Sequence, residues 1–310
     1  MATGRFAPTP SADLHVGNLR TALLAWLFAR SAGSRFLVRV EDLDPRPGSR
    51  AVAERQLADL RALGLDWDGP VTYQSDHRAR HEEALAALVS AGLTFPCYCT
   101  RREVREAAAA PHAPTGAYPG TCRDLTARER AAHEAAGRPA ALRLRSDGRA
   151  VTVHDRLRGP VTAVVDDIVL RRNDGVPAYH LAVVVDDHDQ GVEEVVRGDD
   201  LLEATPSQAH LCDRLGLPRP TWAHVPLVLG PDGRRLAKRH GAVTLADLAV
   251  EGLGAADVLL RLAASLGLSE PGVPPVLDDL VARFDPDRLP REPWVFDSAG
   301  QTPVEEGPGP

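Results

Sequence analysis

The sequence predicts an α/β fold built on a parallel sheet. Residues 1–96 alternate short apolar strands with amphipathic helices, and residues 176–229 return to this alternation after a segment of different character. Such alternation is typical of parallel sheets covered by helices. The chain has 310 residues, of which 44% are hydrophobic and 25% charged. This is an ordinary globular composition, long enough for about two domains.

A first βαβ unit is predicted at the N-terminus. A strand over residues 4–7 ends at Pro8, because proline cannot donate to a sheet ladder. The turn at residues 15–18 precedes a helix predicted over 19–30 and a second strand over 35–40. In such a unit, free N–H groups at the helix N-terminus favour an anion, and ligands lie at the carboxyl ends of the strands. The side chains expected to converge there are those of Arg5, Thr9, His15 and Glu41.

Two more helices are predicted after a loop at residues 45–48. Ser49 is expected to cap the first helix, which Gly64 ends. Ser75 is expected to start the second helix, which Gly92 ends. The side chains expected to face the core are Val52, Leu57, Leu60 and Leu63 in the first helix and Leu85, Leu88 and Val89 in the second.

Residues 97–175 predict an inserted α+β subdomain with a metal site. The segment opens with Cys97-Tyr98-Cys99 and reaches Cys122 before four short strands, predicted at 141–145, 151–155, 161–165 and 168–170. Four cysteines in this chain are no disulfide framework, and three so close together favour a metal. Thiolates suit tetrahedral zinc, for which the residues alone offer Cys97, Cys99 and Cys122 with His112 as the fourth ligand. The alternative is three free buried cysteines.

The remaining elements are less uniform. Residues 178–188 are ambiguous, because their β-branched run favours a strand, whereas the family resemblance described below places a helix there. Further on, strands are predicted over 193–197 and 222–229, helices over 205–215, 245–250 and 255–266, and a disordered tail from 297. Thr205 is expected to cap its helix, and Cys212 to be core. The histidines without partners at ligand or triad spacing, expected to be surface or packed, are His154, His188, His210 and His224.

The basic loop at residues 230–241 contains the only lysine of the chain. Of 36 lysines and arginines, Lys238 alone is a lysine, which suggests that a compact ammonium is wanted at this position. The net charge of −7 argues against non-specific coating of nucleic acid. No glycine-rich dinucleotide fingerprint and no Walker A motif is present, which disfavours NAD enzymes and P-loop NTPases.

Two motifs resemble those of class I aminoacyl-tRNA synthetases in their glutamate-specific form. Pro8-Thr9-Pro10-Ser11-Ala12-Asp13-Leu14-His15-Val16-Gly17-Asn18 resembles the HIGH motif, and Arg235-Leu236-Ala237-Lys238-Arg239 resembles KMSKS. The continuation His240-Gly241-Ala242-Val243 and the stretches Tyr73-Gln74-Ser75 and His81–Leu85 are also similar to this family. The resemblance covers nearly the whole of residues 4–290. It implies a Rossmann-like class I catalytic domain with an inserted zinc-binding α+β subdomain and a short helical C-terminal region.

The resemblance implies ATP-dependent activation of glutamate, with Mg2+ accompanying ATP. His15 and Lys238 would be the catalytic residues, on opposite sides of the nucleotide. Ala237 stands where serine is common, and Asn18 replaces the final histidine of HIGH, so the rate of activation is the property these departures affect. The positions implied to bind ATP are Pro8, His15, Gly17, Asn18, Arg235, Leu236, Ala237, Lys238 and Arg239.

A glutamate substrate requires an anion for its ammonium and an arginine for its side-chain carboxylate. Glu41 fits the first role, and Arg5 and Arg197 fit the second. The alternative for Glu41 and Arg197 is a structural ion pair. The resemblance assigns glutamate binding to Arg5, Phe6, Ala7, Pro8, Thr9, Glu41, Tyr179 and Arg197. It also adds Tyr118 to Cys97, Cys99 and Cys122 as a ligand of one structural zinc.

Residues 239–310 alone follow Lys238, too few for the helical anticodon-binding domain of a full glutamyl-tRNA synthetase. The chain therefore resembles the glutamyl-Q tRNA(Asp) synthetases. That family implies tRNA-independent activation of L-glutamate and its transfer to the queuosine base in the anticodon of tRNA(Asp). The alternatives are a truncated synthetase that charges a 3′ end or a small carrier, and a non-catalytic RNA-binding paralogue. A cytoplasmic monomer without a membrane partner is expected.

The boundaries expected from these patterns divide the chain into five segments. They are the first half of the catalytic domain (1–96), the inserted subdomain (97–175), the second half of the catalytic domain (176–229), the KMSKS-like loop with a helical stem-contact region (230–296), and the tail (297–310).

Overall fold

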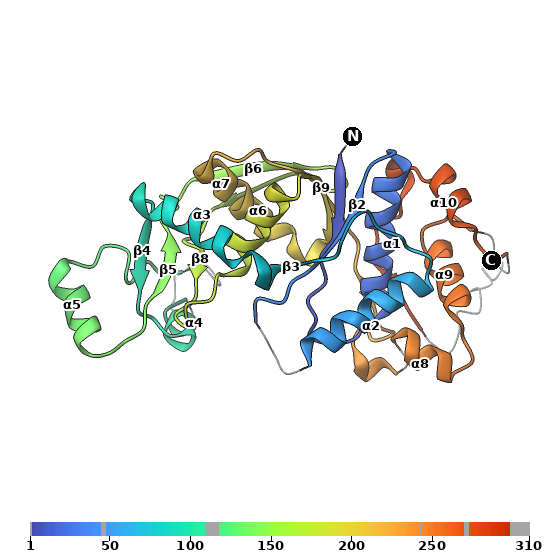
Figure 1. The fold of residues 1–310 in the computed structure, drawn as a ribbon, viewed down its shortest axis with the longest axis horizontal. Coiled ribbons are helices and arrows are strands. Elements are labelled where there is room, and N and C mark those ends of the chain that lie inside the picture. Colours follow the sequence, from blue (N-terminus) through green and yellow to red (C-terminus); the bar gives the residue numbers. More distant parts are fainter. Residues whose placement is uncertain (1, 45–47, 109–117, 242, 270–272, 298–310) are drawn as a thin grey trace, which may run out of the picture.

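The computed structural model describes residues 2–44, 48–108, 118–241, 243–269 and 273–297. A central sheet covered by helices occupies the middle of an elongated molecule (Figure 1). A small cysteine-bearing unit extends from one end, and the C-terminal helices pack against the other end. The described part of the chain contains no helix with the length and apolar character needed to cross a membrane.

The central sheet has seven strands in the order β3-β2-β1-β9-β10-β6-β7. All neighbouring strands are parallel except the β6–β7 hairpin. The chain moves outward from β1 in both directions, so a crevice opens between β1 and β9 at their carboxyl ends. This confirms the predicted α/β class. The strands are β1 (Thr3–Phe6), β2 (Phe36–Val40), β3 (Thr72–Tyr73), β6 (Ala150–Asp155), β7 (Gly159–Val164), β9 (Val192–Gly198) and β10 (Thr221–Val225).

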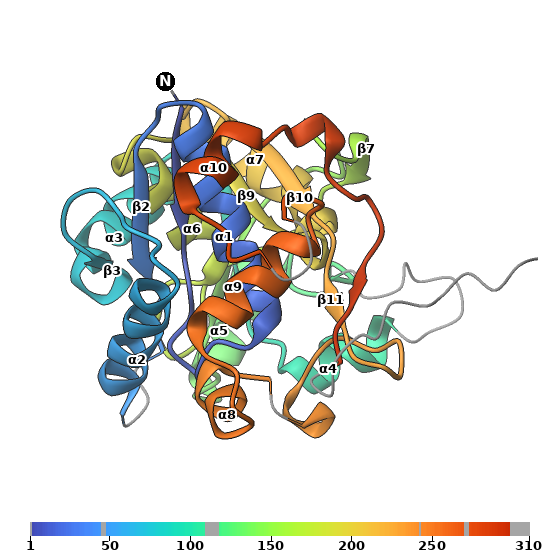
Figure 2. The ribbon, with the colours of Figure 1, turned by 90° about the vertical axis from the view of Figure 1, so that its right-hand side faces the viewer.

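Helix α1 (Val16–Ser31) forms the centre of the core. Nearly every residue from Leu19 to Ala29 is buried, because the helix packs between the sheet and the C-terminal helices (Figure 2). A helix that is apolar on all sides requires such double coverage. The other helices of the catalytic domain are α2 (Ser49–Ala62), α3 (Arg78–Ser90), α6 (Tyr179–Asp189) and α7 (Thr205–Leu215).

The ambiguous segment 178–188 is helix α6 and not a strand. Val183, Val184 and Val185 are all buried among neighbours that include α3 and α7. Burial of one such side chain stabilises by about 1.5–3 kcal/mol. The helix-propensity cost of valine is only a few tenths of a kcal/mol. Tertiary packing therefore outweighs the local strand preference.

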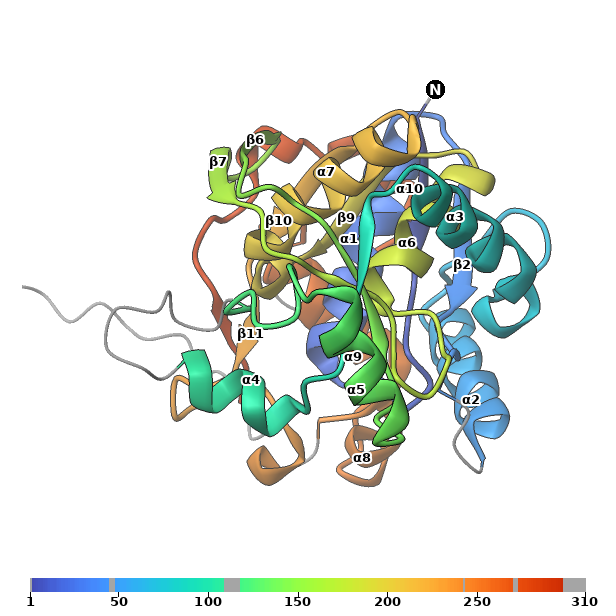
Figure 3. The same ribbon diagram turned by 90° about the vertical axis from the view of Figure 1, so that its left-hand side faces the viewer.

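The cysteine-bearing unit, which faces the viewer in Figure 3, is built on a separate three-stranded antiparallel sheet. Its strands and helices are β4 (Thr94–Cys97), β5 (Ala141–Leu144), β8 (Val169–Arg171), α4 (Arg101–Ala108) and α5 (Ala127–Ala135). Residues 94–96, expected in the first catalytic half, belong to this sheet. The β6–β7 hairpin, expected in the insertion, extends the central sheet. Composition changes at Cys97, whereas backbone pairing follows different limits.

The C-terminal region continues from the central sheet through a second small sheet. The predicted strand 222–229 is divided, because Pro226 has no N–H to donate, and its second part pairs with a strand near residue 295. These elements are β11 (Val228–Leu229), β12 (Trp294–Val295), α8 (Leu245–Val250), α9 (Ala255–Ala264) and α10 (Leu277–Arg283). The short 3-10 turns of the chain are η1 (Gln74–His77), η2 (Asp199–Ala204), η3 (Lys238–His240) and η4 (Pro286–Arg288).

Four local expectations are wrong. Gly48, in the left-handed region at φ +83°, precedes α2 in the place expected for Ser49. Ser75 lies in η1, ahead of α3. Val89 is 49% exposed, since it follows the buried Leu88 onto the solvent side. The Thr205 hydroxyl donates to the Leu201 carbonyl and caps no N–H group of α7. The predicted loop residues 45–47 and tail residues 298–310 lie outside the described part of the chain.

Candidate active site

A cavity of about 430 Å³ opens at the carboxyl ends of β1 and β9. It contains all eight positions predicted for glutamate, together with five of those predicted for ATP, of which Pro8 belongs to both sets. The predicted residues that line it are Arg5, Phe6, Ala7, Pro8, Thr9, His15, Gly17, Asn18, Glu41, Tyr179, Arg197 and Arg235. Leu236 is buried nearby, and Ala237 and Arg239 do not line the cavity. The side chain of Lys238 lies outside what the structure describes.

His15 caps the N-terminus of α1 at the cavity. Its Nδ1 accepts from the Asn18 N–H at 3.2 Å, and the Asn18 Oδ1 accepts from the His15 N–H at 3.2 Å. Burial and the nearby Arg235 hold the pKa of His15 below its usual value. With Nδ1 as acceptor, the neutral ring carries its proton on Nε2. The helix N-terminus therefore presents a neutral N–H donor where an anion is favoured.

The KMSKS-like loop lies beside this turn. The Val16 N–H donates to the Val243 carbonyl at 2.8 Å, and His15 forms a β-bridge with Thr244. Arg235 crosses the cavity mouth to Asp200 at 2.7 Å. The Ala237 N–H donates to His240 Nδ1 at 3.0 Å, which holds the loop at the position where serine is common. Two motifs far apart in sequence therefore border one cavity.

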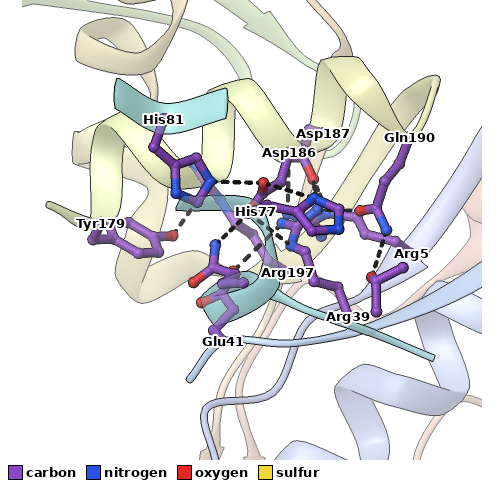
Figure 4. A network of polar contacts seen from close by, with 12 residues as sticks. Arg5, Arg39, Glu41, His77, His81, Tyr179, Asp186, Asp187, Gln190 and Arg197 are labelled. Carbon is purple, nitrogen blue, oxygen red and sulfur yellow. Dashed lines mark hydrogen bonds and ion pairs between the residues drawn. The ribbon is translucent and has the colours of Figure 1, made fainter. Parts of the chain in front are cut away.

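A buried network of charges lies behind the cavity (Figure 4). Arg39 is completely buried and contacts Asp187 at 2.7 Å, Glu41 at 3.4 Å and Gln190 at 2.6 Å. Asp187 also accepts two hydrogen bonds from Arg5, at 3.1 and 3.4 Å. Burial raises the pKa of Glu41, although Arg39 and Arg5 oppose the shift. Arg5 and Glu41 are thus fixed in place by opposite charges that do not line the cavity.

Asp186 anchors the same network from the adjacent position on α6. Its carboxylate contacts His81 Nε2 at 2.8 Å and accepts from Gln74 Nε2 at 2.8 Å. His81 and Gln74 belong to the stretches that carry the family resemblance outside the two main motifs. These stretches therefore support the cavity from behind and do not line it.

Arg197 differs from the other arginines of the site. Its donors reach His224 Nε2 at 2.9 Å, the Thr205 hydroxyl at 2.9 Å and the Tyr179 hydroxyl at 3.5 Å. Within the described ranges, no carboxylate lies within 4 Å of it. Burial lowers its pKa, but arginine stays charged in proteins. The alternative of an ion pair between Glu41 and Arg197 is wrong, because Glu41 pairs with Arg39.

Sequence reasoning did not find several residues that hold the site. Arg39, Asp186 and Asp187 carry no spacing signal, because their partners are distant in the chain. His224 is packed, as expected, and its Nδ1 also lies 2.6 Å from Asp155 Oδ2, a partner too distant in sequence for any spacing to indicate. The only sequence feature that could have indicated these supporting residues is the polar residue near the end of each predicted strand.

The three cysteines form a cluster in the small unit. The Sγ atoms of Cys97, Cys99 and Cys122 all lie within 4.8 Å of one another. The Tyr118 hydroxyl lies 3.4 Å from Cys97 Sγ and accepts from the Cys122 N–H at 2.8 Å. Burial and the neighbouring thiols raise the pKa of Cys99 to about 12. Such a thiol-rich donor set fits zinc, which favours the thiolate form. His112 lies outside the described residues.

The sequence matches the family described as tRNA synthetases class I (E and Q), catalytic domain, over residues 1–298. The glutamyl-Q tRNA(Asp) synthetase of Nocardia farcinica is 61% identical over 306 residues, which cover 98% of this chain and 96% of that protein. The glutamate–tRNA ligase of Azorhizobium caulinodans is 40% identical over 303 residues, covering 94% of this chain and 63% of the ligase.

A solved structure gives the same result. The crystal structure of a glutamate tRNA ligase from Elizabethkingia meningosepticum, in complex with its amino acid, superposes with a TM-score of 0.82 at 25% identity. The superposition covers 96% of this chain and 67% of that one. This likeness confirms the predicted Rossmann-like class I catalytic fold.

Proposed function

Because the chain belongs to the class I tRNA synthetases of the glutamate and glutamine group, a family of ligases, we propose that it activates L-glutamate with ATP and transfers it to a tRNA. The carboxylate of glutamate attacks the α-phosphate of ATP, and pyrophosphate leaves. The resulting adenylate then gives its glutamyl group to a hydroxyl of the tRNA.

The observation that supports this proposal best is the charge arrangement of the cavity. Glu41 presents a buried carboxylate, which suits the substrate ammonium. Arg197 presents a cation with no carboxylate partner among the described residues, which suits the side-chain carboxylate. Tyr179 contacts Arg197 and lines the same cavity. Arg5, already paired with Asp187, has the secondary role of orienting the pocket.

ATP is assigned to the part of the cavity between the N-terminus of α1 and the KMSKS-like loop. His15 donates from Nε2 to phosphate oxygens, and the ammonium of Lys238 neutralises the charge that develops as pyrophosphate leaves. Mg2+ accompanies the nucleotide. Gly17 and Asn18 are assigned to the nucleotide as residues of the first turn, with Pro8 and residues 235–239 completing the set.

We further propose that activation needs no tRNA and that the acceptor is the queuosine base in the anticodon of tRNA(Asp). The names and 44–61% identities of four relatives support this acceptor, whereas four glutamate–tRNA ligases are 38–42% identical. We expect the protein to act as a monomer in the cytoplasm, where ATP, glutamate and tRNA are available. The five segments expected from the sequence are assigned as functional units with two changes: the insertion begins at β4, and the β6–β7 hairpin belongs to the catalytic sheet.

The cysteine cluster is assigned to one structural zinc. Cys97, Cys99 and Cys122 supply thiolates, and Tyr118 is the fourth ligand. In support of this, the four side chains form one cluster at the end of β4, where Cys97 pairs with Ala141 of β5. When bound, zinc would link residues on both sides of the α4 region and stabilise the small unit.

Two assays test the activity. Glutamate-dependent exchange of pyrophosphate into ATP is expected without tRNA, and its absence would favour an RNA-binding paralogue. Labelled glutamate is then expected to enter queuosine-containing tRNA(Asp) and not tRNA(Asp) that lacks queuosine. Equal labelling of both would favour charging of the 3′ end or another acceptor. Periodate treatment of the tRNA distinguishes the two acceptors independently, since the queuosine diol and the 3′ diol respond differently.

A further inference from the structure

Three adjacent strands place one polar side chain each in a row that reaches the cavity at Arg197. Asp155 ends β6, His224 is the penultimate residue of β10, and Arg197 is the penultimate residue of β9. His224 and Arg197 are direct partners in the β10–β9 register. All three residues are buried, at 4%, 0% and 6% exposure. Backbone pairing of the three strands therefore fixes the order of the hydrogen-bonded side chains from Asp155 through His224 to Arg197.

The hydrogen bonds of Asp155 select one tautomer of His224. The Asp155 carboxylate lies 2.6 Å from His224 Nδ1 and also accepts the N–H groups of Leu157 and Arg158 at 2.9 and 2.8 Å. These bonds stabilise the ionised form of Asp155. An ionised carboxylate only accepts, so Nδ1 carries the proton. His224 Nε2 is then an acceptor, and Arg197 Nε donates to it at 2.9 Å.

We propose that Asp155 and His224 are positioning residues that hold Arg197 for the substrate carboxylate without neutralising its charge. This inference rests on the proposed function. An aspartate in direct contact would satisfy the guanidinium and compete with the substrate, as Asp187 does at Arg5. The neutral imidazole of His224, between Asp155 and Arg197, fixes the direction of the guanidinium and separates the anion from the cation. The remaining donors of Arg197 contact a hydroxyl or carbonyl oxygen, which adds no opposing charge.

The surroundings of His224 are consistent with a neutral ring. Arg197 faces it from β9, the Thr205 hydroxyl lies 3.2 Å from Nε2, and Asp199 lies nearby in η2. Burial and Arg197 lower the pKa of His224, while Asp155 opposes the shift. Asp199 is itself bound by Arg158, which reduces its influence on the ring. A protonated ring would direct an N–H at Arg197 and remove the acceptor.

Asp155→Asn tests the tautomer with little change in shape. The carboxamide can donate to Nδ1 and thereby move the ring proton to Nε2, where it opposes Arg197. We expect the dissociation constant and KM for glutamate to rise about ten- to a hundredfold, the range for a lost charge-assisted contact. The KM for ATP should stay within about twofold. His224→Asn, which keeps a donor toward Asp155 but loses the acceptor for Arg197, should give the same pattern.

His210→Asn is the matched control. His210 is buried on α7, its Nε2 accepts from Arg214 Nε at 3.2 Å, and neither residue lines the cavity. Its glutamate affinity should equal that of the wild type. Nitrogen-15 NMR of labelled histidine gives a second readout, because wild-type His224 should show the Nδ1–H tautomer and Asp155→Asn the reverse.

Glutamate affinity is measured by calorimetry, independently of turnover. Unchanged glutamate affinity in both variants would overturn the inference, as would an Nε2–H tautomer of His224 in the wild type. A parallel rise for glutamate and ATP with a lowered melting temperature would show a merely structural role and also overturn it. If the wild type binds glutamate but exchanges no pyrophosphate, the proposed function fails, and the binding comparison still decides the role of Asp155 and His224.

Discussion

The buried arginines of this molecule are of two kinds. Arg5 and Arg39 contact carboxylates, so their charges are balanced within the fold. Arg20 and Arg197 are equally buried, and no carboxylate contacts either of them within the described chain. Balanced arginines shape the site, whereas an unbalanced arginine at a cavity attracts an anion. Sequence alone does not separate the two kinds, because all four lie within or beside apolar runs.

Glu41→Gln is the direct test of the ammonium-binding role. The amide keeps the shape but loses the charge, so the KM for glutamate should rise about tenfold or more, measured by pyrophosphate exchange. Because burial raises the pKa of Glu41, affinity in the wild type should also fall as pH decreases through that pKa. The glutamine variant should lack this contribution. Glu193→Gln, on the exposed face of β9, is the control, and equal behaviour of the two variants would contradict the role.

Lys238→Ala tests the charge expected at the leaving pyrophosphate. Loss of one group that stabilises the transition state costs roughly 10²–10³ in kcat. We expect a decrease of this size in pyrophosphate exchange with an unchanged glutamate dissociation constant. Arg234→Ala, in the same loop but outside the assigned site, should remain close to the wild type. Equal losses of rate and glutamate affinity after Lys238→Ala would assign the lysine to structure.

At the scale of elements, local signals predicted the first βαβ unit well. His15 lies in the turn after the proline-terminated strand, and its side chain caps α1 there. The helix begins at Val16 and not at Leu19. The same signals failed for α6, where burial outweighs valine preference, and for the strand at 222–229, which Pro226 divides. Local patterns thus predict an element well where its packing agrees with them.

Gly17→Ala tests the first turn of α1. A Cβ at this position would lie 2.9 Å from Cε1 and 3.0 Å from Nδ1 of the His15 ring. The ring must move, and its bond to the Asn18 N–H is lost. We expect a higher KM for ATP and slower exchange, with glutamate affinity retained. Gly254→Ala, whose Cβ would meet only Asp257 at 3.5 Å, is the control. An unaffected KM for ATP would argue against His15 as a phosphate donor.

Cys122→Ser tests the metal assignment. Elemental analysis should find about one zinc per wild-type chain and strongly reduced zinc in the variant, because a hydroxyl replaces a thiolate ligand. A chelator should lower the melting temperature of the wild type and have little effect on the variant. Cys212→Ser is the matched control, since this buried thiol lies on α7 away from the cluster. A wild-type protein folded without zinc would contradict the assignment.

At the scale of the whole molecule, sequence predicted the class of fold and many of the cavity-lining residues, but not what holds them. The cavity residues belong to motifs that lie at strand ends, where a parallel sheet must bring them together. Their supports, such as Asp187 for Arg5 and Asp155 for His224, are far away in sequence and carry no motif by themselves. Such contacts follow from the strand order, which composition does not encode. The limits of the inserted subdomain differ from the predicted ones for the same reason.

Arg20 connects the catalytic sheet to the C-terminal helices. It is 2% exposed and donates to the Pro226 carbonyl at 2.9 Å and to the Ser265 hydroxyl at 3.0 Å. Burial without a carboxylate lowers its pKa to about 10. Arg20→Met would leave the Pro226 carbonyl unpaired, so urea denaturation should show a loss of about 1–3 kcal/mol. Arg288→Met, on the surface, should cost little, and equal stability of the two variants would contradict this role.

The central position of β1 has a consequence for synthesis on the ribosome. Thr3 pairs with Val192, so the partner on one side of the first strand emerges from the ribosome long after β1 itself. At about 5–20 residues per second, the delay is roughly ten to forty seconds. Throughout this interval the apolar surface of α1 that later packs on β9 stays uncovered. The nascent chain must therefore keep this apolar helix from aggregation until the second half of the sheet has been translated.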